Sequence, residues 1–267
     1  MLNQRVMTGL VLGPLALMAV FWLPVDYFTI LVALIVMLGG REWASLAGIE
    51  NNNLRWLYAA IIGWLCFLIS IYSVSPMVVL SVAICWWCVA FFLIIRYPDS
   101  ARWCASKVAR LLMGFVTLIP AWLAMVVLKT VHGPFWIVVL LFLVWSTDVG
   151  AYFVGRSFGR CKLAGNVSPK KTIEGMLGGV VLSIFVAVFV CLFCDFSFVE
   201  GLEFIALAVL IALVSVLGDL LESLLKRVRG VKDSSNLLPG HGGILDRIDS
   251  LTAALPVFTL IIIANGG

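Results

Sequence analysis

PMVVLSVAICWWCVAFFLII, residues 76 to 95, contains no charged residue and no glycine. About 20 apolar residues is the length that an α-helix needs to cross the hydrocarbon core of a bilayer. The rest of the chain is similar, since 63% of its 267 residues are hydrophobic and only 12% are charged. Soluble domains carry about 25% charged residues. The composition therefore predicts an all-α integral membrane protein.

Comparable apolar stretches recur along the chain and predict about nine transmembrane helices. The first stretch, Val6 to Pro24, is too long for the core of a signal peptide, so we expect it to be retained as a span. The pair Gly178-Gly179 favours close contact between the seventh span and a neighbouring helix. The expected spans are 6–24, 27–47, 55–73, 76–95, 108–130, 134–155, 175–194, 202–225 and 250–265.

Basic residues are distributed unevenly between the two sides of these spans. If the N-terminus is placed in the cytoplasm, all but one of the 18 Lys and Arg residues lie on the cytoplasmic side, and Lys129 is the exception. The positive-inside rule therefore predicts a cytoplasmic N-terminus and an external C-terminus. For a bacterial source, the expected location is the inner membrane. The loops predicted to lie outside carry Asp26, Asp195, Glu200 and Glu203.

Two predicted cytoplasmic segments are too rich in polar residues to be simple anchors. The first is DVGAYFVGRSFGRCKLAGNVSPKKTIEGMLGG, residues 148 to 179. Asp148 falls inside the sixth span, where a carboxylate is costly and is by default a functional candidate. Lys170, Lys171 and Thr172 lead into the seventh span, and a basic helix entrance can bind phosphate. A topology signal that binds lipid phosphate without specificity explains these charges equally well.

The second segment is GDLLESLLKRVRGVKDSSNLLPGHGGILDRIDS, residues 218 to 250. Glu222 and Lys226 are four residues apart on a helix, so they are expected to form a structural ion pair. Asp219 has no such partner in the sequence and is a functional candidate. Asp246 and Asp249 have i, i+3 spacing and therefore share one helix face.

Grouped at one membrane surface, Asp219, Asp246 and Asp249 would make an oxygen-rich site suited to Mg²⁺. Glycine at positions 240, 242 and 243 would let the backbone approach an anion closely. A solvated basic collar, with His241 donating to backbone, is the structural alternative. The combination of acids, cations and glycines instead indicates phosphoryl or nucleotidyl transfer at the interface. The cations that would neutralise a polyphosphate are Lys226, Arg227, Lys232 and Arg247.

These residues form a pattern that resembles the phosphatidate cytidylyltransferase family, also called CDP-diacylglycerol synthases. The resemblance covers about the last 120 residues, and the first five spans match only in general character. Upstream it includes residues 148–159 and Ser168-Pro169-Lys170-Lys171-Thr172. Downstream it runs through Ser223-Leu-Leu-Lys226-Arg227, Lys232-Asp233 and Pro239-Gly240-His241-Gly242-Gly243-Ile-Leu-Asp246-Arg247-Ile-Asp249.

The resemblance implies that CTP and phosphatidic acid react to give CDP-diacylglycerol and pyrophosphate, with Mg²⁺ required and a second cation compatible with the site. Membrane lipids are expected partners and nucleic acid is not. Asp219 and Asp246 are the expected metal ligands, followed by Asp249 and Asp148. The phosphates would be held by Lys170, Lys171, Lys226, Arg227 and Arg247, and the remaining substrate contacts would come from Ser168, Thr172, Lys232, Gly240, His241, Gly242 and Gly243.

The predicted division of the chain follows from these assignments. Residues 1–130 would hold helices one to five, and residues 131–267 would form the catalytic membrane region with cytoplasmic loops 156–174 and 226–249. The spans between Val6 and Ala47 could form a homodimer contact or face lipid, and the sequence leaves both open.

Three other functions would leave different patterns in the sequence. A solute or ion transporter with an acidic inner gate would also have many spans, but transporters often contain internal repeats. An alcohol phosphotransferase that consumes CDP-diacylglycerol would carry a longer run of spaced aspartates. A catalytically silent scaffold would have no reason to retain all of the charged positions.

Overall fold

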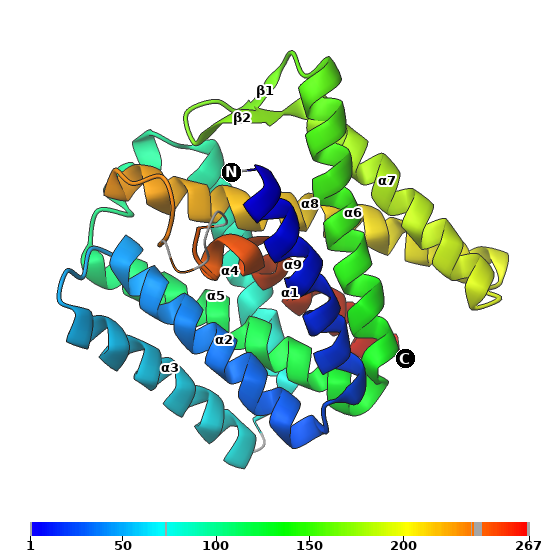
Figure 1. The fold of residues 1–267 in the computed structure, drawn as a ribbon, viewed down its shortest axis with the longest axis horizontal. Coiled ribbons are helices and arrows are strands. Elements are labelled where there is room, and N and C mark those ends of the chain that lie inside the picture. The colour runs from blue at the N-terminus through cyan, green and yellow to red at the C-terminus, as the bar shows by residue number, and fades with distance from the viewer. Residues whose placement is uncertain (1, 73, 236, 238–241, 266–267) are drawn as a thin grey trace.

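The computed structural model describes residues 2–72, 74–235, 237 and 242–265, and for residues 2–10 it describes the backbone alone. Helices dominate this part of the chain (Figure 1). They are α1 (Leu2–Trp22), α2 (Val25–Leu46), α3 (Asn52–Ile71), α4 (Pro76–Ile95), α5 (Lys107–Val127), α6 (Pro134–Phe158), α7 (Ile173–Phe193), α8 (Phe198–Arg229) and α9 (Leu245–Ala264). Short helical turns η1 (Asp99–Arg102) and η2 (Leu128–His132) flank α5.

Eight of the described helices, α2 to α9, are long and apolar enough to cross a membrane. This confirms the prediction of an integral membrane protein with many spans. The described side chains of α1 provide a shorter apolar segment, Val11–Trp22. The ninth crossing and the sidedness of the termini therefore stay predictions.

The structure corrects the all-α prediction at one place. Strands β1 (Lys162–Ala164) and β2 (Ser168–Thr172) form an antiparallel hairpin between α6 and α7. The turn is closed by a hydrogen bond from the Val167 N–H to the Ala164 carbonyl. Because these short strands carry charged residues and no alternating apolar pattern, the period-2 signal that predicts strands is absent from the sequence.

The two predicted loops are also shorter than expected, because the helices that flank them continue further. α6 extends to Phe158, so loop 156–174 reduces to the hairpin and its connections. α8 extends to Arg229, where Gly230 adopts a left-handed conformation (φ +77°) and ends the helix. α9 begins at Leu245, so the loop predicted at 226–249 spans only 230–244.

Glycines bring the helices that surround the polar end of the molecule very close together. A Cβ atom at Gly179 of α7 would lie 2.6 Å from the Thr147 carbonyl oxygen of α6, and one at Gly150 would lie 2.5 Å from the Gly178 carbonyl oxygen. The predicted close contact at Gly178-Gly179 is therefore confirmed. Likewise, a Cβ atom at Gly218 of α8 would lie 2.4 Å from the Asp249 carbonyl oxygen of α9.

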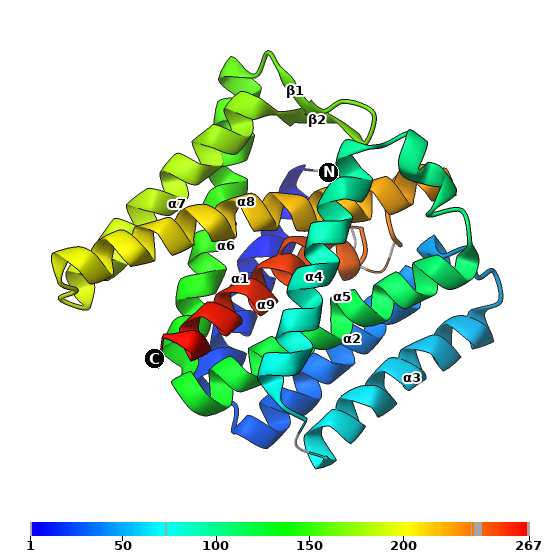
Figure 2. The same ribbon diagram turned by 180° about the vertical axis from the view of Figure 1, so that it is seen from behind.

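Two of these helices begin with side-chain caps. The Thr172 hydroxyl accepts a hydrogen bond from the Gly175 N–H at the start of α7 (3.1 Å). Ser197 and Glu200 form a reciprocal capping box at the start of α8. α9 lies in the interior of the bundle, since α1 crosses in front of it in one view and α4 crosses in front of it from behind (Figures 1 and 2). The polar first turn of α9 therefore faces protein and not lipid.

Candidate active site

A polar cavity of ≈ 520 Å³ opens where α6, the hairpin, α7, α8 and α9 converge. All four predicted acids line this cavity, together with three of the predicted phosphate-binding cations and the predicted substrate contact Thr172. The described lining residues are Asp148, Ala151, Tyr152, Gly155, Arg156, Leu163, Lys170, Lys171, Thr172, Gly175, Met176, Val216, Asp219, Asp246, Arg247, Asp249 and Ser250. Segments separated by about a hundred residues of sequence thus share one chamber.

Asp219 has a partner that the sequence did not reveal. Its Oδ2 lies 2.7 Å from the Nζ of Lys171, and the two side chains are 34% and 22% exposed. Lys171 also donates to the Val216 carbonyl (3.4 Å), and the Ser223 hydroxyl donates to Asp219 Oδ1 (3.3 Å). A partly hydrated ion pair of this kind can exchange partners, because surrounding water compensates each charge.

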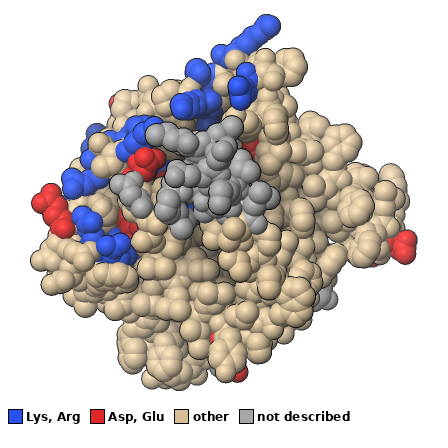
Figure 3. All heavy atoms as spheres, in the orientation of Figure 1, with Lys and Arg blue, Asp and Glu red and all other residues tan. Residues whose placement is uncertain are grey.

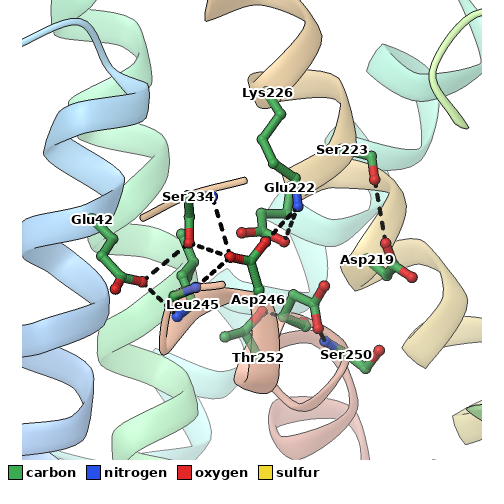
Figure 4. A network of polar contacts seen from close by, with 12 residues as sticks. Glu42, Asp219, Glu222, Ser223, Lys226, Ser234, Leu245, Asp246, Ser250 and Thr252 are labelled. Carbon is green, nitrogen blue, oxygen red and sulfur yellow. Dashed lines mark hydrogen bonds and ion pairs between the residues drawn. The ribbon is translucent and has the colours of Figure 1, made fainter. Parts of the chain in front are cut away.

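Lys226 joins the two acidic groups of α8 and α9. Its Nζ lies 2.8 Å from Glu222 Oε2 and 2.8 Å from Asp246 Oδ1, which confirms the predicted Glu222–Lys226 pair. Glu222 is only 2% exposed, and its Oε1 has no hydrogen-bond partner among the described residues. With Nζ donating to two carboxylates, Lys226 is held in place between the helices (Figure 4).

Asp246 is the most heavily hydrogen-bonded of the four acids. Its Oδ2 accepts from the Ser234 hydroxyl (2.6 Å), the Ser234 N–H (3.2 Å) and the Gly243 N–H (2.7 Å). Figure 4 shows this carboxylate between Lys226 and Ser234. Asp246 therefore ties the 230–244 loop to α8, in addition to lining the cavity.

The two described glycines of the loop are required by this packing. Gly242 has φ +79°, and a Cβ atom there would lie 2.7 Å from Asp246 Oδ2. A Cβ atom at Gly243 would lie 2.2 Å from Ser234 Oγ and 2.4 Å from Glu42 Oε2. The Gly243 N–H, expected to face an anionic ligand, instead donates to Asp246. Gly240 and His241 lie outside the described residues.

Glu42 of α2 is a site component that the sequence analysis missed. It is 2% exposed and accepts hydrogen bonds from the Ser234 and Ser235 hydroxyls (3.2 and 2.6 Å). It also accepts from the Ile244 and Leu245 N–H groups (3.1 and 2.7 Å), at the start of α9. The signal that singled out Asp148, an acid within an apolar span, applies equally to Glu42 and could have identified it.

Six described residues that were predicted to contact substrate do not line the cavity. Lys226, Gly242 and Gly243 make the contacts given above, and the other three are Arg227, Lys232 and Ser168. Arg227 is exposed, and its Nε donates to the Val167 carbonyl (3.1 Å), so it fastens the tip of the hairpin to α8. Lys232 is exposed on the loop that follows α8. Ser168 opens β2, where it pairs with Ala164. Thr172 does line the cavity, although its hydroxyl already accepts a hydrogen bond as the cap of α7.

The donor atoms of the cavity suit a hard cation that brings other ligands with it. The described residues contain no group of three or more His, Cys, Asp or Glu side chains arranged to hold a metal ion. Mg²⁺ keeps several waters and is commonly held by one or two carboxylates together with substrate phosphates. Asp219 is partly exposed, and its side-chain partners among the described residues are Lys171 and Ser223, so it has the carboxylate chemistry for this role. The residues therefore fit a cation that arrives with a phosphorylated ligand.

Basic side chains collect around this end of the molecule. In Figure 3, Lys and Arg side chains run from the hairpin at the top down the left edge of the face, and the lower part of this face is almost free of them. Such a surface raises the local concentration of anionic solutes and of anionic lipid headgroups.

Comparison with known proteins extends the pattern to nearly the whole chain. Residues 3–264 match the model of the cytidylyltransferase family. The chain is 43% identical to a phosphatidate cytidylyltransferase of Pseudomonas aeruginosa, over 100% of this chain and 98% of that protein. It is 38% identical to a phosphatidate cytidylyltransferase of Haemophilus influenzae, over 97% of this chain and 98% of that protein. The similarity thus includes the first five spans, which had matched only in general character.

Proposed function

This chain belongs to the cytidylyltransferase family, and we infer that it transfers CMP from CTP to phosphatidic acid, giving CDP-diacylglycerol and pyrophosphate for phospholipid synthesis. The observation that carries this function is the full-length similarity to two phosphatidate cytidylyltransferases. The polar cavity supports it, because carboxylates and cations of the kind that bind a metal–nucleotide complex line one chamber. The full-length match to enzymes does not support the transporter alternative.

The reaction needs little acid–base chemistry from the protein. An oxygen of the lipid phosphate is already an anionic nucleophile and attacks the α-phosphorus of CTP. A new P–O bond forms, the bond from the α-phosphorus to the bridging oxygen breaks, and pyrophosphate leaves with that electron pair. Catalysis then depends on aligning two anions and on neutralising charge that builds on the leaving group.

We assign the phosphate contacts to cations that face the cavity: Lys170, Lys171 and Arg247. Lys171 would leave Asp219 for a substrate phosphate when the nucleotide binds, since their ion pair is partly exposed. Lys226 is better suited to positioning, because Glu222 and Asp246 already accept its hydrogen bonds. Arg227 would act indirectly by holding the hairpin.

Mg²⁺ is proposed to bind with the nucleotide, with Asp219 as its principal protein ligand and Asp246, Asp249 and Asp148 around it. A bound cation would neutralise the phosphates as pyrophosphate departs. A second cation between the carboxylates and pyrophosphate is compatible with four acids in one cavity. We further propose that the site faces the cytoplasm of a bacterial inner membrane, and that a homodimer contact, if formed, lies in residues 6–47.

The test is pyrophosphate release by the detergent-purified protein from CTP, with and without phosphatidic acid and Mg²⁺. Release should require both. D219N should reduce it at least about 100-fold, which is about 2.7 kcal/mol of barrier. D195N, the same change at an exposed loop position (φ +52°) that asparagine tolerates, is the matched control. A folded wild type that releases no pyrophosphate, or a D219N protein as active as D195N, would contradict the assignment.

A further inference from the structure

A second cavity lies directly against the polar one and has a different character. It has a volume of ≈ 590 Å³ and is bounded by the end of α4, the hairpin tip, α7 and α8. Three residues, Leu163, Met176 and Val216, line both cavities. The two chambers are therefore neighbours across a shared wall. We call the second chamber the lateral groove.

The lateral groove faces the side of the helical bundle. Phe91, Ile95 and Leu213 line it and are 49%, 60% and 42% exposed, so their apolar surfaces are turned outward. In Figure 2, α4 crosses in front of α8, and the hairpin lies above α8 with its tip next to the top of α4. In a bilayer, these outward surfaces would meet lipid chains and not water.

The shared wall carries a cation on its polar side. Lys171, the partner of Asp219, donates a hydrogen bond to the carbonyl of Val216, one of the residues that line both cavities. An anion that crosses from the groove into the polar cavity beside Val216 would therefore pass close to Lys171. The hairpin tip forms one wall of the groove, and Arg227 holds this tip by donating a hydrogen bond to the Val167 carbonyl.

We propose that the lateral groove holds an acyl chain of the lipid phosphate substrate and delivers its headgroup to Lys171. This rests on the proposed function. A lipid that reacts beside Asp219 must keep its chain in apolar surroundings, because each buried methylene contributes about 0.8 kcal/mol. Another apolar cavity, between α1, α2, α5, α6 and α9, is less suited, since none of its described lining residues lines the polar cavity.

The first test fills the groove with L213W and uses L202W as the control, the same change at a 53% exposed position on the same helix. L213W should lower kcat/KM for dioleoyl phosphatidate at least about tenfold, the effect of excluding roughly two methylene groups. The KM for CTP and the rate with a dibutyryl analogue should change less than about twofold. If the wild type is active and L213W has the same kcat/KM for dioleoyl phosphatidate as L202W, the proposal that the groove holds the acyl chain is overturned. An inactive wild type would instead refute the underlying function.

The second test needs no variant and therefore does not depend on L213W folding. A phosphatidate with a diazirine in its acyl chain is photolysed with the wild-type protein, and the labelled peptides are identified by mass spectrometry. Labelling should concentrate on 163–167 and 213–220, and unlabelled phosphatidate should suppress it more strongly than phosphatidylcholine. Labelling spread evenly over exposed apolar helices such as α3 would overturn the proposal.

Discussion

Glu42 and Asp246 together hold the 230–244 loop against the membrane helices. Glu42 accepts from Ser234, Ser235 and the first N–H groups of α9, while Asp246 accepts from Ser234 and Gly243. Removing an acceptor from a buried set of donors leaves those donors unsatisfied, at a cost of about 1–3 kcal/mol each. Both carboxylates are therefore expected to be sensitive to amide substitution.

E42Q should destabilise the protein and weaken nucleotide binding without touching the cavity. Its amide N–H₂ would face groups that already donate, so we expect a loss of about 1–3 kcal/mol and a fall of several degrees in the apparent Tm. The loosened loop should raise the KM for CTP more than it lowers kcat. E203Q, the same change at an exposed residue of α8, should leave both quantities unchanged. Thermal unfolding in detergent and steady-state kinetics would decide.

D246N should cost more stability than D219N. Asp246 is 10% exposed and has a lysine that is 12% exposed and three loop donors as partners, whereas Asp219 is 34% exposed. Breaking a buried ion pair costs about 3–5 kcal/mol, and partly exposed pairs contribute about 0–1 kcal/mol. Apparent Tm values of the two variants, measured side by side without ligand, test this order. Equal Tm values would mean that the Asp246 network contributes little to folding.

Among the side-chain contacts of the site, the sequence predicts only those between residues that are close together in the chain. The Glu222–Lys226 pair could be predicted because both residues lie within one helical turn. Glu42 contacts Ser234 and Leu245, which are 192 and 203 positions further along the chain. The Lys171–Asp219 pair likewise depends on how β2 packs against α8, and spacing within one segment contains no information on that packing.

The α6–α7 contact shows how an element positions the site. Thr147, whose carbonyl oxygen is crowded by Gly179, directly precedes Asp148 in α6. Any side chain at position 179 would therefore push α6 outward and move Asp148 relative to the other acids.

G179A should be both less stable and less active than the wild type. Its Cβ would lie 2.6 Å from the Thr147 carbonyl oxygen, and overpacking of this kind costs about 1–3 kcal/mol. G201A is the matched control, because its Cβ would lie 3.8 Å from the nearest heavy atom, Cys191 Sγ. We expect G201A to match or slightly exceed wild-type stability, as alanine favours helix over glycine. A G179A protein with unchanged Tm and turnover would show that α6 and α7 can move apart at this contact with little cost in free energy.

The elements themselves were predictable to different degrees. Helix positions followed from long apolar stretches, since each span must satisfy its backbone hydrogen bonds internally. The ends were less predictable: α8 continues to Arg229 because a charged helix end can extend beyond the hydrocarbon region. The hairpin could not be predicted, because its hydrogen bonds pair segments whose side chains are mostly polar.

The whole molecule is organised around a polar end and an apolar body. In Figure 1 the hairpin lies at the top and the described part of the 230–244 loop lies at the upper left, and α1 begins near both, while α9 ends at the lower right. The sequence predicted which loops are basic, but not that α9 would be enclosed by the other helices. That arrangement brings Asp246 and Asp249 to a chamber shared with α6, α7 and α8.

The sidedness of this arrangement leads to a prediction about α1. If the basic loops are cytoplasmic, α2 begins and α9 ends on the external side, so the two termini lie on opposite sides only if α1 also crosses. Protease added to spheroplasts should remove an epitope tag placed after residue 267 and spare one placed before residue 1. Inverted membrane vesicles should give the reverse result. Cleavage of both tags in spheroplasts would mean that α1 lies along the surface and that eight helices cross. Cleavage of only the N-terminal tag in spheroplasts would mean that the whole molecule has the opposite orientation. The polar cavity would then face the outside, where CTP is scarce.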